Sequence, residues 1–380
     1  MRNQHSNKVL IAIPCLMLGG TEYQTLNLVH ALRDSGYFPV VLCYFEYDPR
    51  MVNYMKSEGA EVVLMSPDGK RPKGPWSTFI TLWKGFKNAL HTSKPDIIHV
   101  QYMAPGSLAI IIFKLLGARR IIATAHVPGH IYTRKWVPRL LSRYVCDLFL
   151  CVSQSSEQAF FEINPSLYNP QLHKQGRKHF TVYNCTDIPE KLLQKETIDS
   201  FTIGVVSRLS YEKGIDRLLF SMPKILSVFP KLTLLIIGDG SERETLVNIS
   251  QELHIAHAIT WAGLQPKEVL QDHYLQMDIV VIPSRFEGFG LTAIEAMSYG
   301  IPVVASKVDG LMEVIDNNSG ILTDASDPVI FANAIIELLK NPVLRDQMSE
   351  NGHNKVKATF AYNIYQKTIA DIYGNILKRI

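Results

Sequence analysis

Residues 279–300 read IVVIPSRFEGFGLTAIEAMSYG and decide the fold class of this chain. The run opens with four β-branched residues, which are typical of a strand buried on both faces of a parallel sheet. A glycine-containing turn follows, and an apolar helix then runs to Gly300, a common helix stop just before Pro302. A strand, a turn and a helix in this order predict an α/β fold, in which ligands bind beyond the carboxyl ends of the strands.

Short apolar runs alternate with segments of helical period along the rest of the chain as well. In the first half they predict strands near residues 9–13, 40–44, 61–64, 97–101, 121–125, 148–152 and 181–183. In the second half they predict strands near 201–206, 232–237, 259–261, 279–282 and 303–305, in a sheet of five or six strands. Segment 189–200 is polar and weakly patterned, which indicates a linker. The prediction is two Rossmann-like domains, residues 1–188 and 201–362.

The composition of the 380 residues is that of a globular protein. Hydrophobic residues make up 47% and charged residues 19%, which is enough apolar material for packed cores. The net charge of +4 favours anionic partners, but there is no dominant basic block of the kind that binds nucleic acid. The five cysteines are scattered, which gives no zinc-site spacing and fits a reducing cytoplasm. The longest apolar run, 108–116, is too short to span a membrane.

Two acids and two glycines within residues 287–295 are candidates for ligand binding. Glu295 lies on an otherwise apolar helix, where an unpaired carboxylate is unfavourable, so a pair of ligand hydroxyls would be a suitable partner. Gly288 and Gly290 leave backbone N–H groups uncovered at the helix start, where an anion is favoured, and Glu287 lies in the same turn. The alternative is that Glu295 is partly exposed and the glycines serve only the turn.

Two cations follow the strand at 201–206. In the segment SRLSYEKG, residues 207–214, Arg208 and Lys213 flank the same end of the sheet. A charge-assisted hydrogen bond to phosphate contributes roughly 1.5 to 3 kcal/mol, so this pair suits a diphosphate leaving group. A surface salt bridge with Glu212 or another acid is the alternative. Because the chain has neither an Asp-x-Asp motif nor a P-loop, protein cations and helix N-termini are expected to neutralise the phosphates in place of a metal.

Two candidates lie after strands of the first half. Gly19 and Gly20 precede a long amphipathic helix and would let a ligand approach the backbone closely, although a simple turn with Thr21 as N-cap explains them equally well. His126 follows the strand at 121–125, where it could orient a sugar or accept a proton. A lone histidine is more often structural, so His126 is a candidate only in company with the other motifs.

Two further segments have a structural interpretation beside a functional one. Residues 238–244 follow a strand, and Ser241 with Glu244 has the spacing of a capping box, which favours a structural role. The helical segment 134–143 combines four basic residues with apolar ones. It could rest on an anionic membrane surface, or it could be a domain helix with a solvated basic face.

Together these motifs resemble glycosyltransferase family 4, the retaining enzymes of the GT-B fold, over nearly the whole chain. In the first half the resemblance is carried by residues 19–22, 94–99, 126, 153–155 and 182–184. In the second half it is carried by residues 208–209, 212–214, 238–240, 287–295, 300–304, 310 and 313. Two positions depart from the family pattern: Val127 stands where an acid often follows the histidine, and Ser207 replaces the usual glycine before Arg208.

The resemblance implies two Rossmann-like domains that face across a cleft, with residues 363–380 returning to the first domain. It implies metal-independent transfer, with retention, from a nucleotide-diphosphate sugar, a UDP-sugar being favoured over a GDP-sugar, to a glycan, glycolipid or other hydroxyl acceptor. Its catalytic residues would be Glu287, His126, Arg208 and Lys213. The nucleotide sugar would be bound by Gly19, Gly20, Arg208, Lys213, Gly288, Phe289, Gly290, Leu291, Thr292 and Glu295, and no other cofactor is expected.

Two other functions stay open at the level of sequence. A sugar-nucleotide epimerase of the same architecture would bind a similar donor but need no acceptor, and a binding module would hold the sugar nucleotide without turnover. Nucleic acid is not an expected partner. The expected location is the cytoplasm, with peripheral contact to the inner face of the membrane as a further expectation.

Overall fold

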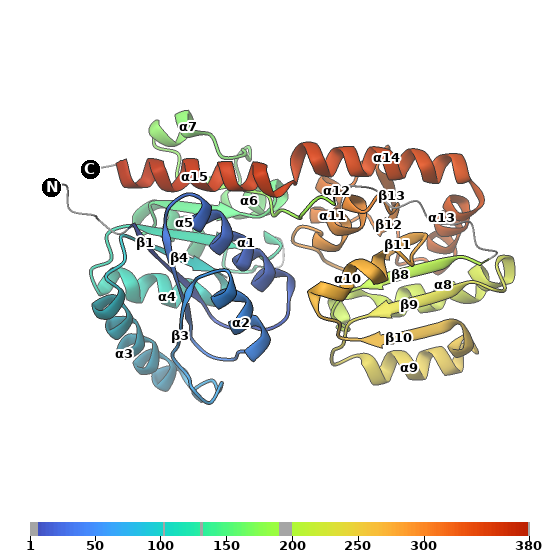
Figure 1. Cartoon of the computed structure of the whole chain (residues 1–380), viewed down its shortest axis with the longest axis horizontal. Helices are drawn as coiled ribbons and strands as arrows, with labels where there is room; N and C mark the ends of the chain where they lie inside the picture. The colour runs from blue at the N-terminus through green and yellow to red at the C-terminus, as the bar shows by residue number, and fades with distance from the viewer. Residues whose placement is uncertain (1–6, 102, 130–131, 190–199, 379–380) are drawn as a thin grey trace. The chain divides into compact units, whose positions relative to one another are not determined.

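The computed structural model describes residues 7–101, 103–129, 132–189 and 200–378. The chain divides into two compact units, residues 1–184 with 362–380, and residues 185–361 (Figure 1). The first boundary predicted from the sequence, at residue 188, falls just inside the second unit, and most of the predicted linker 189–200 lies outside the described residues.

The first unit is a parallel seven-stranded sheet covered by helices on both faces. Its strands are β1 (Lys8–Ile13), β2 (Phe38–Cys43), β3 (Glu61–Leu64), β4 (Ile97–Gln101), β5 (Ile121–Ala125), β6 (Leu148–Cys151) and β7 (His179–Thr181), in the order β3-β2-β1-β4-β5-β6-β7. Its helices are α1 (Gly20–Asp34), α2 (Pro49–Ser57), α3 (Pro75–Ser93), α4 (Met103–Leu115), α5 (Trp136–Tyr144), α6 (Gln154–Phe161), α7 (Pro170–Lys174) and α15 (Tyr362–Lys378). The α/β prediction is confirmed.

Side-chain alternation along the strands of this sheet produces two hydrophobic cores. On β1, Val9, Ile11 and Ile13 enter the core under α1 and α15, whereas Leu10 and Ala12 enter the core under α3, α4 and α5. This is the period-two pattern of a strand buried on both faces. The last helix, α15, inserts Ile369, Ile372, Tyr373 and Ile376 into the first of these cores, so the prediction that the C-terminal helix returns to the first domain is confirmed.

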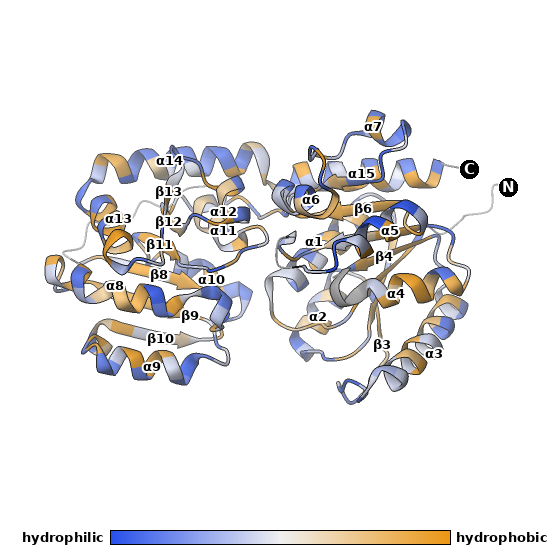
Figure 2. Cartoon of the chain, turned by 180° about the vertical axis from the view of Figure 1, so that it is seen from behind, coloured by the Kyte–Doolittle hydropathy of each residue, from blue (hydrophilic) through white to orange (hydrophobic). Residues whose placement is uncertain are grey.

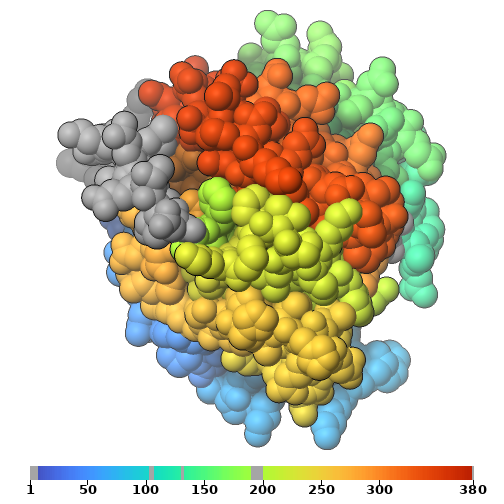
Figure 3. Space-filling model, turned by 90° about the vertical axis from the view of Figure 1, so that its right-hand side faces the viewer, coloured from blue at the N-terminus to red at the C-terminus, as the bar shows by residue number. Residues whose placement is uncertain are grey.

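The second unit has a parallel six-stranded sheet in the order β10-β9-β8-β11-β12-β13. Its strands are β8 (Thr202–Val206), β9 (Thr233–Ile237), β10 (Ile259–Gly263), β11 (Ile279–Ile282), β12 (Val303–Ser306) and β13 (Gly320–Thr323). Its helices are α8 (Ile215–Val228), α9 (Arg243–Glu252), α10 (Lys267–Tyr274), α11 (Leu291–Ser298), α12 (Asp309–Val314), α13 (Pro328–Lys340) and α14 (Pro342–Thr359), with 3-10 turns η2 (Tyr211–Lys213) and η3 (Ala256–Ala258). Figure 3 looks onto this unit, whose outer surface there includes α8, α9 and α13.

Two strands differ from the sequence prediction. The strand expected at 181–183 ends at Thr181, and β13 had no predicted counterpart although it pairs along its length with β12. The break at residues 341–342 is present, because Asn341 caps α14 by accepting a hydrogen bond from the backbone of Leu344.

Candidate functional site

A crevice opens at the carboxyl ends of β8 and β11, two neighbouring strands in the middle of the second sheet. The chain leaves β8 toward β9 on one side, while β11 continues toward β12 on the other. In an open α/β sheet this divergence leaves a space where ligands bind. Its lining consists of Val205, Val206, Ser207, Lys213, Val281, Ile282, Pro283, Ser284, Glu287 and Thr292.

Two of the predicted site residues meet in this crevice. The Lys213 Nζ lies 2.7 Å from Glu287 Oε2, and Ser284 Oγ lies 3.4 Å from the same oxygen. Both charged side chains are partly exposed, with 26% and 16% of their surface accessible. The alternative of a salt bridge between Lys213 and an acid is therefore confirmed in part, with Glu287 from the loop after β11 as the acid in place of Glu212. A lysine and a glutamate held together in this way can bind a phosphate and a sugar hydroxyl once a ligand separates them.

The loop after β11 leads directly into α11. Gly290 has a φ of 113°, a left-handed conformation that favours glycine, and it begins the helix without a side-chain cap. The first N–H groups of a helix have no acceptor within the helix, so they remain available to an anion. Thr292 ties this helix start to the end of β8, because its Oγ1 donates to the Val206 carbonyl at 2.9 Å. Of the predicted residues 288–292, Thr292 lines the crevice, and the other four lie in the loop and helix start between it and Glu287.

Gly310 also contacts the loop after β11, through its backbone. Gly310, in the first turn of α12, donates its backbone N–H to the Glu287 carbonyl at 3.2 Å. A Cβ at position 310 would collide with the backbone of Gly288 and Phe289. Glycine is therefore required here for close packing of two backbones, which explains a position that the sequence motif included without a physical reason.

An arginine that sequence reasoning did not single out connects the loop after β11 to the turn carrying Lys213. The Arg285 guanidinium makes two parallel hydrogen bonds to Asp216, of 2.8 and 2.6 Å, and donates to the Tyr211 carbonyl at 2.8 Å. The central carbon of the guanidinium lies 4.1 Å from the centre of the Tyr211 ring, and the backbone N–H of Arg285 donates to the Glu212 carbonyl. Burial alone would raise the pKa of Asp216, but the hydrogen bonds and the charge of Arg285, together with backbone hydrogen bonds, outweigh burial and lower it.

The exposed side chain of Arg208 lies just beyond the lining of the crevice. In the described part of the chain its guanidinium forms neither a hydrogen bond nor an ion pair with protein. The loop that carries it packs on Gly238 and Gly240, where a Cβ would collide with the carbonyls of Ser207 and Leu209. The predicted capping box of Ser241 and Glu244 is wrong, because α9 begins at Arg243 and has no side-chain cap. The structural role of this segment instead lies in its glycines.

Glu295 also lies outside the lining of the crevice, on α11, and has a partner within the protein. The hydroxyl of Tyr274, at the end of α10, donates to Glu295 Oε2 at 2.8 Å. Burial raises the pKa of Glu295, and the bond from Tyr274 offsets only part of this. Tyr274 is thus the hydrogen-bond donor that this carboxylate was expected to need. The sequence pattern did not identify it, because α10 is amphipathic and the position of Tyr274 indicates an ordinary core residue.

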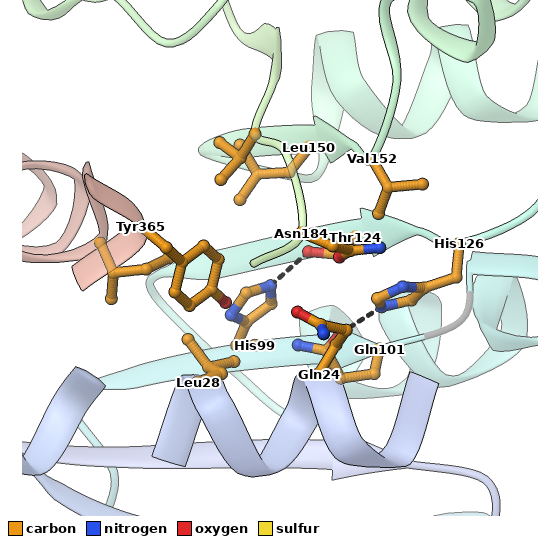
Figure 4. Close-up of a pocket in the computed structure, with 12 residues that line it drawn as sticks. Gln24, Leu28, His99, Gln101, Thr124, His126, Leu150, Val152, Asn184 and Tyr365 are labelled. Carbon is orange, nitrogen blue, oxygen red and sulfur yellow. Dashed lines mark hydrogen bonds between the residues drawn. The ribbon is translucent and has the colours of Figure 1, made fainter. Parts of the chain in front are cut away.

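A pocket lined by both polar and apolar side chains lies at the carboxyl end of the first sheet (Figure 4). Its lining consists of Gln24, Leu28, His99, Gln101, Thr124, His126, Leu150, Val152, Val182, Asn184, Tyr365 and Ile369. The Nε2 of His126 lies 2.6 Å from Gln101 Oε1, so that this nitrogen is the donor. Burial lowers the pKa of His126 to about 3, which leaves a neutral ring at physiological pH. Such a ring suits hydrogen bonding to a hydroxyl better than accepting a proton.

A second histidine lies beside it and is fully enclosed. His99 on β4 is only 2% exposed, and its Nε2 lies 2.6 Å from the hydroxyl of Thr124 on β5 (Figure 4). Its Nδ1 lies 2.6 Å from the hydroxyl of Tyr373 on α15. Burial lowers the pKa of His99 to about 3 as well, with a smaller effect from His126. His99 therefore joins the C-terminal helix to the sheet beneath this pocket.

The predicted glycines Gly19 and Gly20 begin α1 and are not part of the pocket lining. Gly19 is the extended N-cap residue and has no side chain with which to cap, and Gly20 is the first residue of the helix. The alternative with Thr21 as the N-cap is wrong, because Thr21 lies inside the helix. Gln24, one turn further along α1, reaches the pocket.

Comparison with known proteins accounts for both units. Residues 18–165 match the family model described as Glycosyltransferase Family 4, and residues 189–355 match the model described as Glycosyl transferases group 1. The chain belongs to glycosyltransferase family 4. It is thus a glycosyltransferase with the GT-B fold that the resemblance implied.

Relatives of this glycosyltransferase include two uncharacterized glycosyltransferases of Methanocaldococcus jannaschii. The first is 30% identical over 62% of this chain and 58% of its own length, and the second is 26% identical over 88% of this chain and 89% of its own length. The match with the first relative therefore covers little more than half of that protein. The Anabaena protein HepE, solved in complex with UDP and glucose, has a TM-score of 0.78 at 20% identity, covering 97% of this chain and 100% of that chain. At this identity the likeness shows the shared fold.

The described residues contain neither a cluster suited to a metal ion nor a helix suited to cross a membrane. Within ranges 7–101, 103–129, 132–189 and 200–378, no group of three or more His, Cys, Asp and Glu side chains is arranged to hold a metal ion. Over the same described residues, no helix has the length and apolar character needed to cross a membrane.

Proposed function

We propose that this glycosyltransferase moves a sugar from a UDP-sugar to a hydroxyl of a glycan or lipid-linked acceptor, with retention of the anomeric configuration and without a metal. The observation that carries the proposal is the Lys213–Glu287 pair in the crevice beside the start of α11. HepE, which has the same fold, was solved with UDP and glucose, and this supports a UDP-sugar donor. The five free cysteines support a reducing compartment such as the cytoplasm.

In the proposed reaction, the donor diphosphate enters the crevice as a dianion and draws Lys213 away from Glu287. Lys213, Arg208 and the first N–H groups of α11 then neutralise the phosphate oxygens. The bond between the anomeric carbon and the β-phosphate oxygen breaks, and the electron pair stays on that oxygen. The acceptor oxygen bonds to the anomeric carbon on the same face, and its proton passes to the departing phosphate. Charge develops mainly on the phosphate, so these cations stabilise the transition state.

The remaining predicted residues have proposed roles in binding. Glu287, released from Lys213, accepts hydrogen bonds from hydroxyls of the transferred sugar, while Glu295 accepts from the ribose hydroxyls. In the first unit, the neutral ring of His126 hydrogen-bonds a substrate hydroxyl, and Gly19 with Gly20 allows close approach to the backbone at the start of α1.

A thermal-shift panel tests the donor assignment. UDP and UDP-sugars are expected to raise the melting temperature of the protein because they bind only its folded state, and GDP is expected to raise it less. In Lys213→Ala the shift from UDP should largely disappear. The matched control is Lys355→Ala. Lys355 lies in the second unit, away from the crevice, and forms a 2.8 Å ion pair with Asp316. Equal shifts in Lys213→Ala and the control would contradict the site.

Mass analysis of the products formed with and without an acceptor separates a transferase from an epimerase.

Arg285 is expected to act as a positioning residue through Lys213. Because it holds the turn that carries Lys213, Arg285→Ala should lower kcat/KM about tenfold to a hundredfold by misplacing that cation. Arg285→Lys should restore little, since a lysine cannot make two parallel bonds to Asp216. The decisive measurement is a double-mutant cycle with Lys213→Ala. If Arg285 acts through Lys213, the second substitution adds little to the first. Fully additive losses would show that Arg285 has only a separate structural role.

The pH dependence of nucleotide binding tests the role of Glu295. Its raised pKa means that Glu295 takes up a proton at a higher pH than an ordinary carboxyl, and the protonated form accepts ribose hydroxyls poorly. UDP affinity should therefore fall on mild acidification. Tyr274→Phe removes the bond that lowers this pKa, so the fall should move to higher pH. Calorimetric titration of UDP from about pH 7 to about pH 5 measures both effects. Glu295→Gln should lack this part of the pH dependence, and an unchanged profile in that variant would refute the role.

A further inference from the structure

Three neighbouring helices of the first unit share an outer face that has both apolar and basic side chains. α4 packs beside α3 on one side and α5 on the other, and Figure 2 shows the three helices next to one another over the sheet. Their inward sides are buried in the same core, which contains Leu82, Phe86, Ile110, Phe113 and Leu141. The residues that remain outside are therefore not needed to hold these helices to the sheet.

Each of the three helices exposes large apolar side chains one turn apart. On α5 these are Trp136, Leu140 and Tyr144, which are 59%, 46% and 64% exposed. On α4 they are Ile111 and Leu115, and on α3 they are Trp76 and Ile80. Residues four apart lie on the same side of a helix, so each set forms a stripe and not a scatter of isolated residues. Stripes of exposed apolar side chains on three neighbouring helices are a candidate interaction surface.

The same part of the chain is almost free of acidic residues. Residues 69–146 contain thirteen Lys and Arg, at positions 70, 71, 73, 84, 87, 94, 114, 119, 120, 134, 135, 139 and 143, and a single acid, Asp96. The chain has 39 Lys and Arg against 35 Asp and Glu, so the remaining residues carry 26 against 34 and are net acidic. The sequence showed no dominant basic block because these cations are spread over separate helices and loops, and the fold brings them to one unit.

Among the residues that the structure describes, two of these thirteen cations form an ion pair with an acid. Arg71 pairs with Glu46 and Arg139 pairs with Glu162. The carboxylate of Asp96 accepts a hydrogen bond from the Lys8 backbone at the edge of the sheet. Lys84, Lys87 and Lys114 are exposed on α3 and α4. Lys84 lies one turn after Ile80, so it continues the apolar stripe of α3.

We infer that the α3–α4–α5 face docks on the surface of an anionic lipid bilayer. Trp and Tyr favour the headgroup region, the aliphatic side chains favour the acyl boundary below it, and Lys and Arg favour anionic headgroups. A second copy of this chain fits poorly because two faces of the same charge repel each other. Nucleic acid would use the cations but not Ile80, Ile111, Leu115 and Leu140. This inference does not depend on the reaction proposed above.

Co-sedimentation of the 380-residue chain with vesicles tests the inference. The protein should bind vesicles of phosphatidylglycerol and phosphatidylcholine at about 0.05 M salt, bind weakly at about 0.5 M salt, and bind pure phosphatidylcholine poorly. Trp136 fluorescence, assigned with Trp136→Phe, should be quenched by brominated lipids in the anionic vesicles. Failure to bind the anionic vesicles at low salt would overturn the inference, as would equal binding to both kinds of vesicle. Binding to nucleic acid without binding to anionic vesicles would overturn it as well.

Matched variants identify the face. Trp136→Ser with Leu140→Ser should weaken vesicle binding at least about tenfold, whereas Ile330→Ser with Val343→Ser, two exposed apolar residues of the second unit, should not. Lys84→Gln, Lys87→Gln and Lys114→Gln together should weaken it about a hundredfold, since each cation near an anionic surface contributes about fivefold. The charge control is Lys231→Gln, Lys340→Gln and Lys357→Gln, three exposed lysines of the second unit. Unchanged melting and an unchanged UDP shift show that each variant is folded, and wild-type binding by the face variants would refute this assignment.

Discussion

Lys213→Ala and Glu287→Ala are each expected to lower the rate of sugar transfer by about a hundredfold to a thousandfold or more, with little change in folding. The two side chains lie 2.7 Å apart in the crevice, and the proposed donor uses both. Removing a single preorganised group that stabilises developing charge commonly has an effect of this size. An ion pair of this partial exposure contributes little to stability, about 1 kcal/mol or less, so melting and the far-UV spectrum should stay close to those of the wild type.

The two variants should differ in what they lose. Lys213→Ala removes a cation that faces the phosphates, so it should weaken binding of UDP itself as well as transfer. Glu287→Ala removes a carboxylate that faces the sugar, so binding of UDP should be retained, or even strengthened because Lys213 is no longer held, while transfer is lost. The control is Lys355→Ala, whose activity should match the wild type. Normal turnover in both crevice variants would remove the proposed site.

The sequence predicted the second unit well because its strands are nearly continuous apolar runs. IVVI at β11 and the glycine turn after it leave few alternatives to a buried strand followed by a helix. β13, with the sequence GILT, has only two large apolar residues between polar neighbours, so its strand character depends on pairing with β12. Pairing partners far apart in the chain are not visible in local periodicity.

The same limit applies to the site. Lys213 and Glu287 could be predicted because each lies in the loop that follows an apolar strand, and parallel strands bring their carboxyl ends to one edge. Arg285 could not be predicted, since its role depends on Asp216, which is far from it in the chain and looks like an ordinary acid in the first turn of α8. The roles of Tyr274 and His99 could not be predicted for a related reason. Both side chains are buried, and a buried polar side chain can be recognised from the sequence only when its hydrogen-bond partner is known.

Acidification is expected to destabilise the first unit through His99. Its pKa is lowered from 6.5 to about 3 by burial, so the folded state binds fewer protons than the unfolded state between these values. The stabilising effect of the neutral ring is complete above pH 6.5 and is lost progressively as the pH falls toward 3. At about pH 5 the loss should be about 2 kcal/mol, since one pKa unit corresponds to about 1.4 kcal/mol. His126, whose pKa is lowered in the same direction, adds to this loss.

The contribution of His99 can be isolated with His99→Gln, which keeps polar atoms near the hydroxyls of Tyr373 and Thr124 but cannot titrate. Hydrogen exchange of the amides of β4, measured from about pH 7 to about pH 5 and corrected for the intrinsic rate, reports the opening free energy of this unit. The wild type should lose about 2 kcal/mol more than the variant over this range. His353→Gln in the second unit, where the histidine ring bonds to the Ser298 carbonyl, should leave the β4 result unchanged. Identical pH profiles for the wild type and His99→Gln would mean that His99 takes up its proton as readily in the folded state as in the unfolded chain, and that its enclosure between α15 and the sheet does not hold the ring neutral.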